Sequence, residues 1–295
     1  MIDEKAFVPS QINLGNLDSL SSDADVISKR RLCEISEIAD AATNACVDFK
    51  NNGLDVYEIL SLLSEGVAFD NTNDKIFFAK ILPERLKKRG ISFTESHFLS
   101  EAYRPQTFIY VKNTLSDEAY DIFSQEFSSP RLRYAANMRE AVKAVSDGEV
   151  GYCLLPLEER GGARLASVAD LIFGNNLKIN SVTPVFGQDG NADMKYALVS
   201  KCFSVPKVLE DDDRYLEISL PFSEAIGLGE ILYAAKELGI SPYRVNTVSF
   251  YTEDGLVPNY SIVFRDDGGD FTSLLTYLTL YSREFVPIGI YKNLE

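Results

Sequence analysis

Few of the side chains that most often carry enzyme chemistry are present in this sequence. His97 is the one histidine, and no G-x-S-x-G segment offers a nucleophilic serine to pair with it. The four cysteines are far apart and show no C-x-x-C spacing, so we expect small buried apolar side chains and no metal site at Cys33, Cys46, Cys153 and Cys202. No cofactor is indicated. Any chemistry must therefore use hydroxyl groups, carboxylates, lysine or arginine.

The balance of charge excludes one large class of partner. The 295 residues include 29 Lys and Arg against 44 Asp and Glu, a formal net charge of −15. Nucleic-acid binding depends on clustered cations that displace counterions from phosphates, so we expect no nucleic-acid partner. No apolar run approaches the roughly 20 residues of a membrane span, and the first residues lack the basic-then-apolar order of a signal peptide. The sequence predicts a cytoplasmic protein that does not bind a membrane.

The first third of the chain is predicted to be helical after a mobile arm. Residues 1–26 are rich in Ser, Asp and Asn and show no hydrophobic period. In the segment 27–104, apolar residues recur at intervals of three and four from Ile35 to Phe49 and again from Val56 to Leu63. Each set therefore lies on one face of a helix, and we predict a helical N-terminal module over 27–104.

The hydrophobic period changes near Thr107, and residues 105–205 alternate strands with helices. Residues 107–111 read as a strand, and residues 113–116 as a turn that ends in a helix N-cap. The run 152–157 is almost continuously apolar, as a strand buried on both faces requires. Alternating strands and helices predict an α/β lobe with a mostly parallel sheet.

The last part of the chain, residues 214–295, follows an acidic boundary at Asp211–Asp213. Alternating apolar residues near 216–220, 248–250, 260–264 and 286–290 predict strands, and two helical stripes lie between them. The resulting order is βαββαβ, which predicts a ferredoxin-like sandwich with two helices on one face of its sheet.

Four segments resemble the prephenate dehydratase family. Residues 113–119 resemble its G-T-F-S-x-E-A, residues 148–160 resemble its G-x-A-D-Y-G-V-V-P-I-E-N-S, and residues 170–172 resemble the end of its T-x-D-L-L. Residues 239–240 and 288–291 resemble the pattern of an ACT domain. The resemblance implies a periplasmic-binding-protein-like α/β lobe, a C-terminal ACT domain, a homodimer formed through ACT domains, and a link to phenylalanine biosynthesis.

The segments that would form the family's active site differ from its pattern. The family's Thr-Arg-Phe motif, to which dehydration and decarboxylation of prephenate are attributed, corresponds to Met194-Lys195-Tyr196. Methionine has no hydroxyl, and Lys195 keeps a charge without the planar fork that grips a carboxylate. Thr114, Ser116 and Glu158 remain. With Lys195 they are the candidate catalytic residues that the resemblance implies, if the protein is active.

A second difference concerns the cleft. The family places a whole second lobe between the strand near Val185 and Met194, where this sequence has only residues 186–193. A single lobe leaves an open surface, without the opposing wall that excludes water and positions charges. A lid would have to come from elsewhere in the chain, and residues 27–100 do not resemble the missing lobe.

The ACT effector site is altered as well. The family's G-A-L turn and E-S-R-P motif, which lie between paired ACT domains, correspond here to residues 226–228 and 246–249. Glycines still allow close backbone approach, and the polar side chains still form hydrogen bonds. The candidate effector-binding residues are therefore Gly227, Leu228, Gly229, Asn246 and Thr247.

The sequence leaves three hypotheses about function. The first is a non-catalytic regulatory protein that binds an aromatic amino acid or a prephenate-like carboxylate. The second is an active prephenate dehydratase with a rebuilt site, in which Thr114 or Ser116 donates a proton, Lys195 anchors the carboxylate and Glu158 orients. The third is a purely structural or interaction protein. We favour the first, because several positions of the implied active site have changed together and a lost proton donor costs on the order of 10²–10⁴ in rate.

Overall fold

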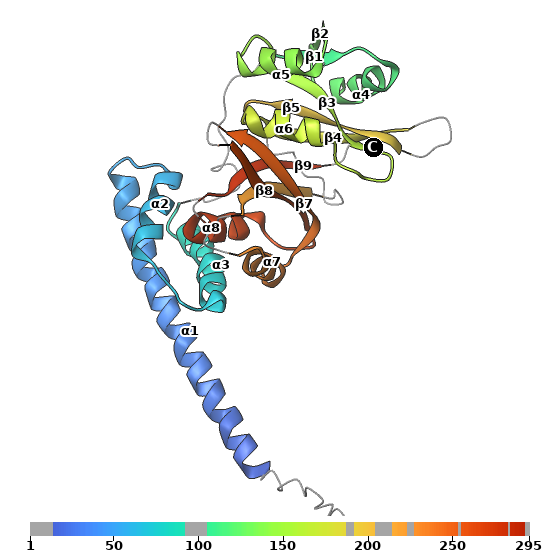
Figure 1. Cartoon of the computed structure of the whole chain (residues 1–295). Helices are drawn as coiled ribbons and strands as arrows, with labels where there is room; N and C mark the ends of the chain where they lie inside the picture. Colours follow the sequence, from blue (N-terminus) through green and yellow to red (C-terminus); the bar gives the residue numbers. More distant parts are fainter. Residues whose placement is uncertain are drawn as a thin grey trace, which may run out of the picture.

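In the computed structural model, the strands of the α/β lobe and the C-terminal unit form one large mixed sheet, and helices pack on its faces (Figure 1). The strand order, over the residues that the structure describes, is β2-β1-β3-β5-β4-β9-β6-β8-β7. The described residues are 14–91, 105–186, 192–203, 214–222, 227–252, 255–282 and 284–292.

The α/β lobe supplies one half of this sheet. Its elements are β1 (Thr107–Val111), α4 (Thr114–Ser124), β2 (Arg131–Ala135), α5 (Met138–Ser146), β3 (Tyr152–Glu159), α6 (Ala166–Gly174), β4 (Lys178–Phe186) and β5 (Ala192–Ser200). Helix α4 packs on one face of the sheet, where Ala119 and Phe123 are buried. Helices α5 and α6 pack on the other face, where they share a core with alternate residues of β3.

The expectation of a mostly parallel sheet holds for only part of the lobe. Strand β1 pairs in parallel with β2 and β3, but β5 runs antiparallel to both β3 and β4. The reason is the short connection of residues 187–191, because a parallel pair needs a crossover of a dozen or more residues. The same short connection leaves no room for a second lobe between β4 and β5.

The C-terminal unit supplies the other half of the sheet, in the order β9-β6-β8-β7. Its elements are β6 (Arg214–Pro221), α7 (Leu228–Glu237), β7 (Ile240–Thr252), β8 (Gly255–Asp266), α8 (Phe271–Tyr281) and β9 (Val286–Lys292). Helices α7 and α8 bury their apolar sides against one face of these strands. The ACT assignment of this unit stays a prediction.

The two units meet along β4 and β9, and they share a hydrophobic core. The strands pair in parallel at Ile179 and Gly289. Side chains of the C-terminal unit enter the core of the lobe at this seam: Tyr215, Val263, Ile288 and Tyr291. The predicted segments 105–205 and 214–295 therefore contribute side chains to one shared core, and their division into two domains stays a prediction.

Three helices precede the lobe: α1 (Leu14–Asn51), α2 (Val56–Gly66) and α3 (Thr72–Lys88). Helix α1 begins at Leu14, inside the segment 1–26 that the sequence predicts to be a mobile arm. The physical reason is cooperativity, because a helix already packed through Ile35 to Cys46 extends by one hydrogen bond for each residue added.

These helices do not form a lid over the lobe. Helix α3 packs against α7 and α8, with Ile76 and Ala79 in the core of the C-terminal unit. A polar contact reinforces it, since Glu230 on α7 accepts hydrogen bonds from Lys75 (3.0 Å) and Thr72 (3.1 Å). Figure 1 shows α1–α3 beside the C-terminal unit, away from β1, β2 and α5.

Replacing Gly289 by alanine should destabilise the protein, because the seam leaves no space for a Cβ atom. A Cβ built there lies 2.6 Å from the Ile179 carbonyl oxygen, a backbone atom that cannot move without shifting β4. We expect the free energy of unfolding in urea to fall by about 1–3 kcal/mol. Gly174→Ala at the end of α6 is the control, because nothing lies within 4 Å of its Cβ position. Equal stability of the two variants would contradict the close approach at the seam.

Candidate functional site

A large cavity lies at the carboxyl ends of the parallel strands of the lobe. Its volume is about 360 Å³. It is lined by Val111, Asn113, Ser116, Ala136, Asn137, Met138, Leu154, Pro156 and Tyr196. The chain leaves β1 toward β2 and leaves β3 toward β4, in opposite directions along the sheet. The cavity thus lies at a topological switch point, where open α/β sheets bind ligands.

Two helix N-termini line this cavity, and each is capped by an asparagine. Asn113 accepts a hydrogen bond from the Ser116 backbone amide (2.9 Å) at the start of α4. Asn137 accepts one from the Glu140 amide (2.9 Å) at the start of α5. The partial positive charge of a helix N-terminus attracts anions, and two of them act on one cavity here.

The remaining wall is largely apolar. Met138, Leu154 and Pro156 contribute carbon atoms, and Tyr196 contributes a buried ring from β5. Burial raises the pKa of Tyr196, although its hydrogen bond with the Asn113 side chain partly offsets that effect. The phenol therefore stays protonated at neutral pH. The cavity combines an anion-attracting end with an apolar body, and the described residues that line it include no carboxylate, histidine, lysine or arginine.

Two of the predicted catalytic residues, Thr114 and Ser116, lie at the start of α4. Thr114 is exposed and is not among the residues that line the cavity. Ser116 lines it, but its hydroxyl is engaged in the cap: it accepts from the Asn113 amide (2.9 Å) and is within donating distance of the Val111 carbonyl (2.8 Å). The hydroxyl therefore holds the chain in place, and donating to a ligand would give up its hydrogen bond to the Val111 carbonyl.

The other two, Glu158 and Lys195, lie on the opposite face of the sheet. A β-bulge at Leu157 is the physical reason. Pro156 is paired with Tyr196 and lines the large cavity, whereas Glu158 is paired with Lys195 and faces the seam. An extra residue in one strand reverses the side to which the following residues point. Of the four residues that the resemblance groups together, Ser116 thus lines the cavity, Glu158 and Lys195 face the seam, and Thr114 lines neither site.

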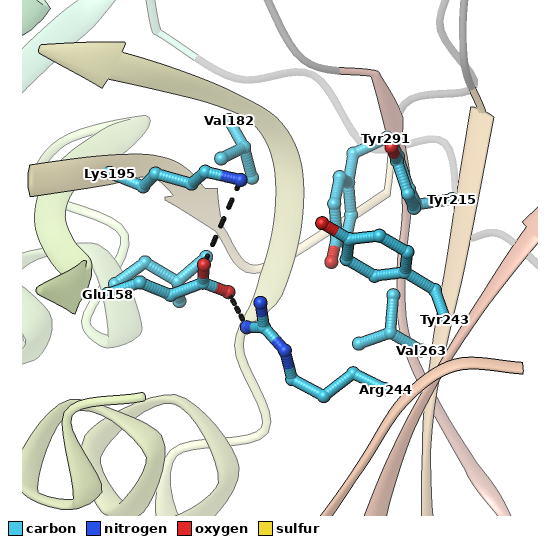
Figure 2. A pocket seen from close by; sticks show the side chains of 9 residues that line it. Glu158, Val182, Lys195, Tyr215, Tyr243, Arg244, Val263 and Tyr291 are labelled. Carbon is cyan, nitrogen blue, oxygen red and sulfur yellow. Dashed lines mark hydrogen bonds and ion pairs between the residues drawn. The ribbon is translucent and has the colours of Figure 1, made fainter. Parts of the chain in front are cut away.

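Glu158 is the centre of a buried charge cluster at the seam (Figure 2). It forms an ion pair with Arg244 of β7, and lies 3.7 Å from Arg164 and 3.8 Å from Lys195. Arg164 also binds Glu217 of β6 at 2.6 Å. The cluster contains three cations and two carboxylates. It lies beside a cavity of about 10 Å³, which is close to the space of one water molecule.

Local backbone geometry places Arg164 in this cluster. Gly161 and Gly162 adopt φ angles of 93° and 82°, which favour glycine, and they turn the chain back so that Arg164 bridges Glu158. Burial alone would lower the pKa of Arg164, but attraction to Glu217 and Glu158 outweighs it and raises the pKa. Arg164 therefore stays charged inside the protein.

The candidate effector residues are dispersed in the described chain. Gly227 is the N-cap of α7, and Leu228 and Gly229 begin that helix. Asn246 and Thr247 are neighbours in β7, so their side chains point to opposite faces of the sheet. One copy of the chain therefore cannot direct both into a single cavity, and an effector site between paired copies stays a prediction.

Other expectations about reactive groups have mixed outcomes. All four cysteines are free, and three are buried, but Cys33 is exposed on α1, contrary to the expectation. Burial raises the pKa of Cys153 to about 12, which makes this thiol unreactive. His97 lies outside the described residues. Within the described ranges, no group of three or more His, Cys, Asp or Glu side chains is arranged to hold a metal ion, and none of the helices has the length and apolar character needed to cross a membrane.

Comparison with known proteins identifies the fold. Neither a protein-family model nor a curated protein matches the sequence. The X-ray structure of prephenate dehydratase from Streptococcus mutans matches with a TM-score of 0.50 and 16% identity, covering 64% of this chain and 99% of that chain. The chain has a prephenate dehydratase-like fold. The resemblance to prephenate dehydratase that the four sequence segments indicate is confirmed as a distant likeness of fold, and the ACT domain stays a prediction.

Two further structures show weaker likeness. One is described as GqqA, a novel type of quorum quenching acylase, with a TM-score of 0.46, 16% identity, and coverage of 63% of this chain and 95% of that chain. The other is prephenate dehydratase from Arthrobacter aurescens in complex with L-Phe, with a TM-score of 0.46, 14% identity, and coverage of 63% and 89%. At these identities, prephenate dehydratase-like describes the fold and not the activity.

Asn113 should matter for stability and Thr114 should not, although the two are adjacent. Asn113→Ala removes the cap of α4, which typically costs about 0.5–2 kcal/mol of unfolding free energy. Thr114→Ala is the matched control, because its exposed position should keep the change within about 0.5 kcal/mol. Urea denaturation of both variants measures the difference, and a larger loss for Thr114→Ala would contradict the cap.

Proposed function

We propose that this protein is a non-catalytic, prephenate dehydratase-like binding or regulatory protein that takes a small carboxylate into the 360 Å³ cavity of its lobe. The observation that carries the proposal is the division of the candidate catalytic residues. Ser116 is bound in a helix cap, while Glu158 and Lys195 face the seam on the other side of the sheet. Proton transfer needs a donor within hydrogen-bond reach of the reacting atom, and this division keeps Glu158 and Lys195 out of reach of a ligand in the cavity.

The ligand class follows from the wall of the cavity. Two capped helix N-termini favour a carboxylate at one end, and Met138, Leu154 and Tyr196 favour an apolar or aromatic body at the other. The volume falls within the roughly 300–1,000 Å³ of small-molecule sites. An aromatic amino acid or a prephenate-like carboxylate matches both features.

Dimer formation through the C-terminal units is part of this proposal. The βαββαβ order supports an ACT assignment, in which effectors bind between paired domains. Strand β9 is already paired with β4, and α7 and α8 are contacted by α3. The outer strand β7 is thus the edge on which a second copy would pair, which would bring the two copies of Asn246 and Thr247 near one another.

Purified protein should not convert prephenate to phenylpyruvate. The expected rate is at the uncatalysed background, because the Ser116 hydroxyl is engaged with backbone groups and Glu158 and Lys195 face the seam. Authentic Streptococcus mutans prephenate dehydratase, assayed in parallel by phenylpyruvate absorbance, is the positive control. Turnover that Lys195→Ala abolishes would overturn the proposal and restore the active-enzyme reading.

Carboxylate binding should depend on the charge at the cavity and not on the cap itself. Asn137→Asp keeps the cap of α5, because aspartate caps as well as asparagine, but it places a negative charge beside the ligand. We expect phenylalanine or prephenate to raise the melting temperature of the wild type. A ligand at 100 times its dissociation constant should add about 2.7 kcal/mol to the free energy of unfolding. Asn137→Asp should weaken binding by about ten-fold or more.

The control for this measurement is Asn71→Asp, which makes the same change at the N-cap of α3, far from the cavity in sequence and packed with the N-terminal helices. Equal affinity of Asn137→Asp and wild type would place the ligand elsewhere. Failure of every aromatic carboxylate to stabilise the wild type would favour the third reading, a purely structural or interaction protein.

A further inference from the structure

Two of the register shifts in the sheet, one in β3 and one in β7, turn oppositely charged residues toward the same seam. The bulge at Leu157 directs Glu158 out of the lobe, as described above. In β7 the pairing shifts between Pro242 and Arg244, so Tyr243 is the extra residue and Arg244 is paired with Val263. Val263 belongs to the core of the lobe, so Arg244 lies on that side of its strand as well.

Neither charge would reach the seam in a regular strand. Because side chains alternate, Glu158 would share the face of Pro156, and Arg244 would share the face of Pro242. Bulges locally disrupt the hydrogen-bond ladder and are typically functional features of a sheet. Two of the register shifts in the sheet thus lie at the two ends of one ion pair.

The burial of the partners makes the pairing specific. The Glu158 side chain is 8% exposed and Arg164 is 6% exposed, whereas Arg244 is 20% exposed. Removing one partner of a buried pair leaves the other charge without compensation. Among the described residues, Glu158 Oε2 and two nitrogens of Arg164 lack hydrogen-bond partners. Such a cluster adds little net stability, but it penalises any arrangement in which the two units shift relative to one another.

We propose that Glu158 and Arg244 form an interunit latch, which holds the C-terminal unit in one orientation on the lobe. Arg164 and Lys195 support the carboxylate from the side of the lobe, and Arg164 ties the cluster to Glu217 of β6. Figure 2 shows Arg244 reaching across from β7 to Glu158, with Lys195 approaching from the opposite side. Glu158 is then a positioning residue, and this role is independent of whether the large cavity binds a carboxylate.

Hydrogen exchange under native conditions tests the latch. In Arg244→Met, amides on both sides of the seam, at 179–182 and 288–291, should exchange about ten-fold or more faster than in wild type. Amides of the helical core between α1 and α3 should keep their rates, which separates seam opening from global unfolding. Unchanged exchange at the seam would overturn the latch.

A double-mutant cycle tests whether the two residues act together. Glu158→Gln and Arg244→Met should show a coupling of about ten-fold or more in the unfolding equilibrium constant. The matched control is the exposed pair Arg30 and Glu34, as Arg30→Met and Glu34→Gln, for which about two-fold is expected. Additive effects at Glu158 and Arg244 would overturn the proposal.

Glu158→Gln leaves three cations near one carboxylate. If this variant does not fold, Arg244→Lys is the milder variant that tests the latch. Arg244→Lys keeps the charge and loses the planar fork. It should give seam exchange between that of wild type and Arg244→Met. Exchange as fast as in Arg244→Met would show that charge is irrelevant at this position and would also count against the latch.

Discussion

The parallel contact between β4 and β9 is the constraint on which the rest of the molecule depends. It requires a residue without a side chain, because the carbonyl of Ile179 occupies the position that a Cβ of residue 289 would take. Once the backbones meet there, Tyr215, Val263 and Tyr291 complete the core of the lobe. The same contact brings β7 and β8 close enough for Arg244 to reach Glu158. Without it, the core of the lobe would lack the side chains that the C-terminal unit contributes, and the ion pair between Glu158 and Arg244 would not form.

The seam and the large cavity contain different kinds of polar group. Charged side chains are gathered at the seam, in a region of low dielectric where each has a partner of opposite sign. The cavity keeps backbone amides, two asparagine caps and one neutral phenol. Fixed dipoles of this kind bind an anion without exchanging protons with it. This division of polar groups supports the proposed role of the cavity in carboxylate recognition.

Much of the fold could be predicted from the sequence, because local periods specify it. The run 152–157 and the alternation at 216–220 correspond to β3 and β6, and the helical stripe from Ile35 to Cys46 lies in α1. The start of α1 and the antiparallel direction of β5 differ from prediction, since the first depends on propagation from packed residues and the second on the length of one connection.

The candidate site was less predictable. A signal for Asn137 was available, because Asn137 and Glu140 have the spacing of a capping box before the apolar positions of α5. No local signal identifies Arg244 as the partner of Glu158, because 86 residues separate them and two bulges decide their directions. No local signal identifies Tyr196 and Met138 as cavity residues either, since an apolar residue in a strand or helix usually packs in a core.

The bulge at Leu157 affects how residue roles can be transferred between distant relatives. A motif such as P-x-E identifies a strand and the order of its residues, but one inserted or deleted position exchanges everything that follows between the two sides of the sheet. A change of one residue can therefore move a carboxylate out of a binding pocket, or into one, although the sequence motif is still recognisable.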